Sequence, residues 1–158
     1  MLEAAKTTQL PVVILGGGGL EAELKAKAKQ LGLSNVHFLG GLPDEDKAAL
    51  LQLCYAFVFP SHLRSESFGI SLLEGAMYGK PMISCEIGSG TTYINIAGET
   101  GLVVPPRDSV ALAAAMTQLW NQPEVAALMG RAAERRFEAV FSADSMAESY
   151  AEIYRSLL

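Results

Sequence analysis

Short apolar runs alternate with longer amphipathic stretches along the first two thirds of the chain, and this alternation limits the possible folds more than any other feature. The runs are apolar throughout, which is typical of strands buried on both faces of a parallel sheet. Strands that alternate with helices in this way predict βαβ units. The expected strands lie at 10–15, 36–39, 55–59, 81–85 and 101–104, and the expected helices between them lie at 20–31, 43–53 and 69–78.

The pattern changes after Asp108. Three helical stretches, 110–120, 123–140 and 142–158, follow one another with no strand between them. The fold class predicted is therefore α/β, a Rossmann-like doubly wound parallel sheet that ends in a helical layer. We find no repeat, linker or low-complexity tract, so residues 1–158 are expected to form a single domain.

The start of the chain departs from this scheme. Residues 1–9 have the pattern of a helix that runs straight into the first expected strand, at residues 10–15. A doubly wound sheet normally begins with a strand before that helix. We therefore expect the chain to be a fragment whose first strand lies before residue 1.

Composition excludes several classes of protein. Half of the residues are hydrophobic, 18% are charged and the formal net charge is −5, so neither a disordered chain nor a general nucleic-acid-binding protein is expected. No apolar run is long enough for a membrane span, and no signal sequence is evident, which favours a cytosolic domain. Cys54 and Cys85 lack any CxxC or histidine pairing, so we expect buried thiols with no disulfide, metal or cofactor.

The segment from Glu66 to Met77 is the most informative for function. It follows the end of an expected strand, where open α/β sheets bind ligands. Ile70, Leu73 and Met77 have the spacing of a buried helical stripe, and Glu74 falls inside that stripe. A carboxylate in such a place needs a partner or a ligand.

Glu66 precedes the start of the same expected helix. There, the free backbone N–H groups of Gly69, Ile70 and Ser71 would point toward an anion. An alternative interpretation is that Glu66 is a favourable charge at a helix N-terminus and Glu74 a solvated residue. Residue spacing alone leaves both interpretations open.

Glu66 and Glu74, with seven residues between them and Phe-Gly-Ile inside the interval, resemble the EX7E motif of family 4 retaining glycosyltransferases with the two-domain GT-B fold. The resemblance extends from about residue 10 to the C-terminus. It implies that the chain is the C-terminal, donor-binding half of such an enzyme. Further segments that resemble the family are 12–16 with the glycines after it, 36–40, 59–61, 79–81 and 99–108.

The resemblance assigns roles to individual positions. Glu66 matches the glutamate that contacts the donor sugar near the reacting carbon, and is the catalytic candidate. Glu74 matches the glutamate that holds the ribose hydroxyls. The other nucleotide-sugar-binding candidates are Phe68, the diphosphate-binding amides of Gly69, Ile70 and Ser71, the glycine-rich turn at Gly16 and Gly17, and the base-reading loop at Gly41 and Leu42.

The implied reaction transfers a hexose from a nucleoside diphosphate sugar to a hydroxyl acceptor, with retention and without an essential metal. A glycan or lipid-linked sugar would be held by an N-terminal domain, and an Arg and a Lys that clamp the diphosphate would precede residue 1. The resemblance implies bacterial polysaccharide or cell-envelope glycan synthesis. The full-length enzyme would be cytoplasmic, or peripheral at the inner face of the membrane, with no integral membrane segment and no nucleic-acid partner.

Two other functions stay open: a nucleotide-sugar epimerase of GT-B architecture, and a non-catalytic Rossmann-type binding module. The sequence names neither the base, the sugar, the acceptor nor the linkage. Among secondary candidates, His62 and Arg64 lie in the loop that would face the sugar, and His37 is expected to be a packed core histidine. Three arginines of the terminal helices are expected to be solvated: Arg131, Arg135 and Arg136.

Overall fold

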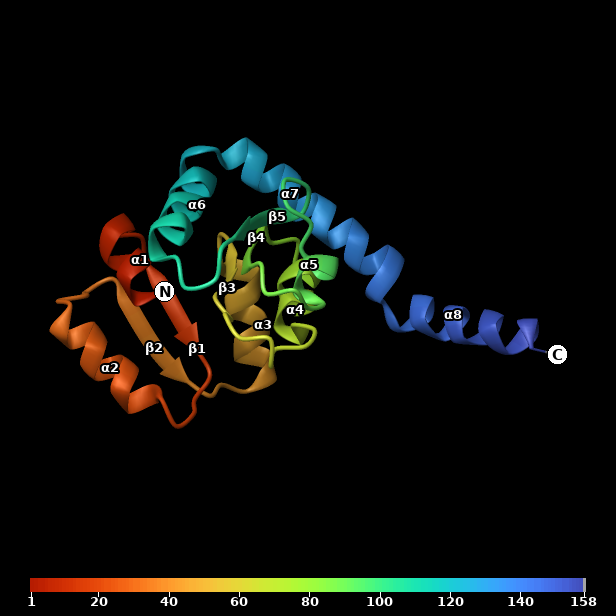
Figure 1. Cartoon of the computed structure of the whole chain (residues 1–158), viewed down its shortest axis with the longest axis horizontal. Coiled ribbons are helices and arrows are strands. Elements are labelled where there is room, and N and C mark those ends of the chain that lie inside the picture. Colours follow the sequence, from red (N-terminus) through yellow and green to blue (C-terminus); the bar gives the residue numbers. More distant parts are fainter. Residues whose placement is uncertain (158) are drawn as a thin grey trace.

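A computed structural model describes residues 1–157 and has an α/β architecture with parallel strands (Figure 1). The strands form two sheets: β1 (Val12–Leu15) pairs with β2 (Val36–Gly40), and β3 (Phe57–Phe59), β4 (Met82–Cys85) and β5 (Gly101–Val104) pair in that order. All five predicted strands are confirmed. The helices are α1 (Leu2–Thr8), α2 (Glu21–Gln30), α3 (Asp44–Leu53), α4 (Ile70–Met77), α5 (Thr91–Ile94), α6 (Ser109–Asn121), α7 (Pro123–Arg136), the π-helical turn η1 (Phe137–Phe141) and α8 (Ala143–Ser156).

Local sequence accounts for the starts of several helices. Pro43 precedes α3, whose first turn is acidic, and the side chain of Asp108 accepts hydrogen bonds from the first amides of α6. The short helix α5 was not predicted. The stretch 123–140, predicted as one helix, is α7 followed by η1. The last predicted helix, 142–158, is confirmed as α8, and its final residue, Leu158, lies outside the described residues.

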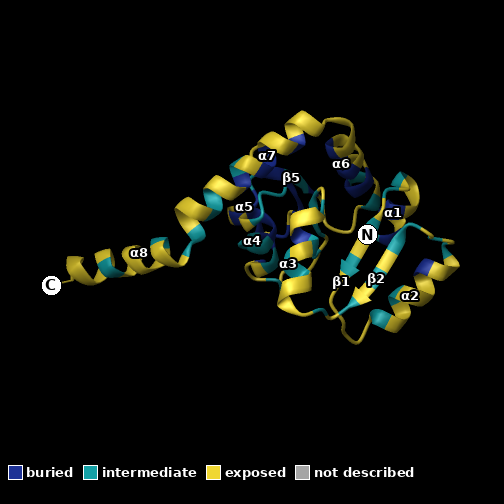
Figure 2. Ribbon diagram, turned by 180° about the vertical axis from the view of Figure 1, so that it is seen from behind, coloured by how far each residue is buried: buried dark blue, intermediate teal, exposed yellow. Residues whose placement is uncertain are grey.

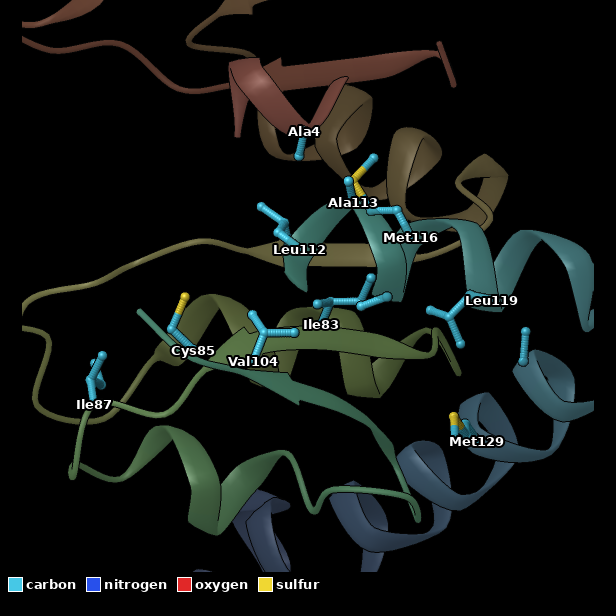
Figure 3. Packing of buried hydrophobic residues seen from close by; sticks show 12 residues of the cluster. Ala4, Ile83, Cys85, Ile87, Val104, Leu112, Ala113, Met116, Leu119 and Met129 are labelled. Carbon is cyan, nitrogen blue, oxygen red and sulfur yellow. The ribbon is translucent and has the colours of Figure 1, made fainter. Parts of the chain in front are cut away.

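The three-stranded sheet forms the centre of the core. All four residues of β4 are buried, as expected for a strand covered on both faces. On one face, Ile83 and Cys85 pack with Leu112 and Leu119 of α6 and with Met129 of α7 (Figure 3). On the other face, a second cluster contains Met82 of β4 with Leu72 and Ala76 of α4, Ile94 of α5 and Ala133 of α7. The sheet therefore carries helices on both sides.

The two-stranded sheet is less covered than the sequence predicts. Residues along β1 and β2 alternate between partly buried and exposed, and Val13 is 49% exposed (Figure 2). His37, paired in register with Val13, is also exposed, so the prediction of a packed core histidine is wrong. Leu15 and Leu39, which alternate onto the same face, are exposed as well.

Helix α4 presents a different face to the core from the predicted one. Its buried residues are Leu72, Gly75 and Ala76, whereas Ile70 is 71% exposed and Met77 43% exposed. Small residues face β3 because the helix lies close to it: a Cβ on Gly75 would lie 2.8 Å from Cγ of Phe57. The predicted buried stripe is therefore wrong at Ile70 and Met77, whereas Leu73 is partly buried and packs against the second cluster. Glu74 is partly exposed and does not lie within a buried stripe.

The last helix, α8, extends away from the rest of the molecule (Figures 1 and 2). It is joined to α7 through η1 and has no buried residue. Its exposed apolar side chains are Met146, Tyr150, Ile153 and Tyr154, and Leu157, directly after the helix, is exposed as well. Neither α8 nor any other helix in residues 1–157 is long and apolar enough to cross a membrane.

Candidate functional site

The candidate residues lie in loops that follow the carboxyl ends of strands. Gly16 follows β1, Gly41 follows β2, and Glu66 lies between β3 and α4. The N–H of Gly16 donates to the carbonyl oxygen of Gly40 at 2.7 Å, which holds the first two loops together. Ligands bind at this edge of open parallel sheets because the loops converge there.

The two glycine-containing loops expose backbone rather than side chains. Gly16 has φ 104°, a left-handed conformation that favours glycine, and it turns the chain at the end of β1. Gly17 and Gly41 are exposed, while Leu42 is partly buried. Their arrangement leaves backbone groups open for contact with a ligand.

The start of α4 supplies backbone donors. Gly69 precedes the helix with φ 95°, and no side chain caps this end. The N–H groups of Ile70 and Ser71 have no acceptor within the helix, since they belong to its first turn. This end of the helix therefore carries a partial positive charge and suits an anionic group.

Glu66 is partly buried at a hollow of about 240 Å³ in the loop before α4. Its backbone N–H donates to the carbonyl oxygen of Leu63 at 3.1 Å. His62 lines the same hollow, whereas Arg64 is exposed near Gly88. The lining residues are Ser61, His62, Leu63, Ser65 and Glu66.

Glu74 is paired with a lysine that the sequence had not indicated. Lys47 of α3 donates from Nζ to Oε1 of Glu74 at 2.9 Å, and Nζ lies 3.2 Å from Oδ1 of Asp44. The hydrogen bond to Glu74, and next that to Asp44, raise the pKa of Lys47 above its ordinary value. The Glu74 side chain is 33% exposed, so it is neither a core residue nor a freely solvated one.

A second and larger hollow, of about 420 Å³, lies between α3 and α4. Glu74 lines it, and Glu66 does not. The structure thus links Glu74 to α3, the helix that directly follows the Gly41–Leu42 loop, and places Glu66 in a separate hollow. The lining residues are Asp44, Glu45, Lys47, Ala48, Leu51, Glu74, Met77 and Tyr78.

Helix α5 supports the loop that carries Glu66. The N–H of Gly90, at the start of α5, donates to the carbonyl oxygen of Ser67 at 2.9 Å. A Cβ on Gly90 would lie 2.5 Å from Cδ2 of Phe68, so only glycine allows this close approach.

The described part of the chain contains no group of three or more His, Cys, Asp or Glu side chains that could bind a metal ion.

Parallel strands, a glycine-rich turn and an uncapped helix start at the carboxyl edge define a Rossmann-like ligand-binding domain. The chain belongs to the glycosyl transferases group 1 family, whose model matches residues 1–136.

Two relatives cover nearly all of the chain. It is 66% identical over 143 residues, 90% of its length, to the D-rhamnosyltransferase WbpZ of Pseudomonas aeruginosa. It is 56% identical over all 158 residues to the O-antigen chain mannosyltransferase C of Escherichia coli. The chain spans only 38% and 43% of the lengths of these two relatives.

Solved structures show the same fold. Anabaena Alr3699/HepE in complex with UDP matches 98% of the chain with a TM-score of 0.88 at 23% identity, over 44% of its own length. A sucrose-phosphate synthase from Thermosynechococcus elongatus matches 99% of the chain with a TM-score of 0.84 at 28% identity, over 42% of its own length. The fold is therefore that of the C-terminal half of a GT-B glycosyltransferase.

Proposed function

We propose that the chain is the donor-binding half of a retaining family 4 glycosyltransferase, which moves a hexose from a nucleoside diphosphate sugar to a hydroxyl acceptor. The observation that carries the proposal is the uncapped start of α4, with Glu66 before it and Glu74 one turn into it. The relatives support a role in O-antigen or related cell-envelope glycan synthesis, since their names state a rhamnosyl and a mannosyl transferase.

The chemistry requires stabilisation of a departing diphosphate. Fixed backbone N–H groups at the start of α4 would stabilise the developing negative charge, because they are oriented before the reaction begins. The turn at Gly16 and Gly17 would approach the donor from the neighbouring strand. Glu66 would orient the sugar through its hydroxyl groups rather than act as a simple base, since transfer with retention needs the nucleophile held against the leaving group.

Glu74 would hold the ribose. A carboxylate accepts hydrogen bonds at two oxygens, so it can bind two neighbouring hydroxyl groups. Lys47 bonds to one of these oxygens, Oε1, and anchors the side chain to α3. The base would then lie near Gly41 and Leu42, in the loop that leads into the same helix.

The rest of the enzyme would come from residues outside this chain. We propose that a further strand precedes residue 1 and inserts between β1 and β3, joining the two sheets into one. Within residues 1–157, each of these strands pairs on one side only, and Val12 and Val58 pack against the same core cluster. An N-terminal domain would hold the glycan or lipid-linked acceptor, at the cytoplasmic face of the membrane.

The test is donor binding by the enzyme that contains this chain, measured by thermal shift with UDP-, GDP-, ADP- and dTDP-sugars. One nucleotide class should raise the melting temperature. Glu74→Ala should weaken that binding about 10- to 100-fold, because charge-assisted hydrogen bonds are each worth roughly 1.5–3 kcal/mol. Glu124→Ala, an exposed position in α7, serves as the control.

Four outcomes would contradict the proposal. If no nucleotide sugar shifts the melting temperature, the site does not bind a donor. If Glu74→Ala melts earlier yet binds as wild type does, Glu74 is structural. Release of free nucleotide with an epimerised sugar would favour the epimerase, and binding without any turnover would favour a binding module.

A further inference from the structure

The end of α7 departs from regular helix geometry next to the proposed donor site. Residues Phe137–Phe141 form the π-helical turn η1, where the sequence predicted an uninterrupted α-helix. Such turns are rare and occur frequently at functional sites, where they redirect side chains. Phe137 and Phe141 of η1 both pack against the buried cluster that contains Leu72 of α4.

Phe141 connects this turn to two other segments. Its ring meets the ring of Phe68 edge-on, at 6.3 Å between centroids and 70° between planes. It meets the ring of Tyr93 in the same manner, at 5.6 Å and 87°. Phe68 lies two residues after Glu66 and directly before Gly69, so Phe141 contacts the centre of the proposed donor loop.

Arg136 fixes the second of these segments. Its Nη2 donates to the carbonyl oxygen of Tyr93 at 2.6 Å, and its guanidinium carbon lies 5.1 Å from the Tyr93 ring centroid and 5.5 Å from that of Phe141. The prediction of a solvated Arg136 is therefore wrong, while Arg131 and Arg135 are exposed as predicted. The cation stacks on the aromatic rings and holds α5 against η1.

The same segment of α5 holds the donor loop from a second direction. Gly90 donates its N–H to the carbonyl oxygen of Ser67 and contacts Phe68 closely. Gly90 thus holds Ser67 and Phe68 on one side, and Phe141 contacts the ring of Phe68 on the other. Glu66 and Gly69 directly flank this dipeptide in the chain.

We propose that Phe141 is a positioning residue for sugar transfer: by holding Phe68, it keeps the Glu66 carboxylate and the Gly69 amide in place. The inference rests on the proposed function of this loop. Edge-to-face aromatic pairs are individually modest, so removal of the ring should loosen the loop without unfolding the domain. The loss should appear in the transfer step, since small misplacements of sugar-contacting groups lower the rate of reaction strongly.

The test compares Phe141→Ala with Phe137→Ala in the enzyme that contains this chain. Phe137 is a matched control because it is on the same turn and packs against the same cluster, and it makes no ring–ring contact within residues 1–157. Hydrogen–deuterium exchange of peptides spanning 61–69 and 88–94, without ligand, reports on the loop directly. Phe141→Ala should accelerate this exchange at least tenfold relative to Phe137→Ala.

Kinetics of the same variants separate positioning from stability. Phe141→Ala should lower kcat at least tenfold with the Kd for the bare nucleoside diphosphate unchanged within twofold, and Phe141→Tyr should restore kcat. Equal loop exchange in the two alanine variants, or equal kcat, would overturn the proposal. Donor binding by the wild-type enzyme, measured alongside, tests the proposed function separately. Hydrogen–deuterium exchange of the loop is measured without ligand, so its result does not depend on donor binding.

Discussion

At the scale of single residues, the pairing of Lys47 with Glu74 decides how the proposed ribose site is organised. The two side chains come from different helices, 27 positions apart in the sequence, and each is about one third exposed. An exposed ion pair contributes little to stability. Its value would be to hold a carboxylate in the orientation that a ligand needs.

Lys47→Met removes the ion pair and keeps much of the length of the side chain. We expect nucleotide affinity to fall several-fold, because Glu74 loses its anchor, and stability to change little. Since the pKa of Lys47 is raised in the fold, its stabilising effect is fully present below its ordinary value of 10.5 and is lost as the pH rises through the raised value. Binding titrations and melting curves from pH 7 to 11 check both expectations.

Lys25→Met is the control for this variant. Lys25 pairs with Glu21 within α2 and should leave nucleotide binding unchanged. Tighter binding by Lys47→Met would mean that Lys47 competes with the ribose for Glu74, and the proposed anchoring role would then be wrong.

Glu66→Gln tests the division of roles between the two glutamates. We expect the transfer rate to fall about 10- to 100-fold, because a charge-assisted hydrogen bond to the sugar becomes a neutral one. The affinity for the bare nucleoside diphosphate should stay within twofold of wild type, since Glu66 lies in a different hollow from Glu74. Steady-state kinetics and calorimetry would show this, and an equal loss of nucleotide affinity in the Glu66 and Glu74 variants would refute it.

At the scale of elements, the sequence predicted where strands and most helices lie but not which faces they bury. Runs such as 101–104 are bounded by glycine and proline, so the neighbouring residues predict where these strands begin and end. The buried face of α4 is set by its close approach to Phe57, which selects Gly75 and Ala76 over larger residues. Such a choice depends on a neighbouring strand and not on spacing within the helix.

The sequence did not predict α5 or η1 for a related reason: contacts with distant residues, and not a local pattern, determine them. Helix α5 has four residues, which are too few for a periodic pattern. The turn η1 interrupts a stretch whose sequence has a regular helical pattern, and the ring of its Phe141 contacts Phe68 and Tyr93. In the candidate site, the glycine turns and both glutamates could be named from the sequence. Lys47 could not, because its partner lies on another helix.

Gly130→Ala tests the packing of α7 on the turn between α4 and β4. Gly130 is buried, and a Cβ there would overlap the carbonyl oxygen of Gly79. The gain in helix propensity is smaller than the cost of overpacking against a backbone atom, so we expect a net loss of about 1–3 kcal/mol in the free energy of unfolding. Denaturant unfolding measures it. Gly19→Ala, where a Cβ meets open space, should stay near wild type, and a stable Gly130→Ala would contradict the close approach.

At the scale of the whole molecule, the two sheets share one core but do not pair with each other. In the described chain, β1 pairs only with β2, and β3 only with β4. Unpaired strand edges attract strands of other molecules. In the polypeptide of residues 1–158 on its own, the unpaired edges of β1 and β3 are therefore available for association.

Expressed alone, this polypeptide should associate with itself, bind nucleoside diphosphate weakly and transfer no sugar. Weak binding follows because backbone amides would face the diphosphate without the basic residues expected before residue 1. Absence of transfer follows because an acceptor must be held in register with the donor. Sedimentation velocity at several concentrations measures association, and Val13→Lys, which places a charge on β1, should reduce it. Incubation with donor and a cell-envelope acceptor fraction, against a Glu66→Ala control, measures transfer. A glycosylated product above that control would show that the catalytic unit is contained in these 158 residues.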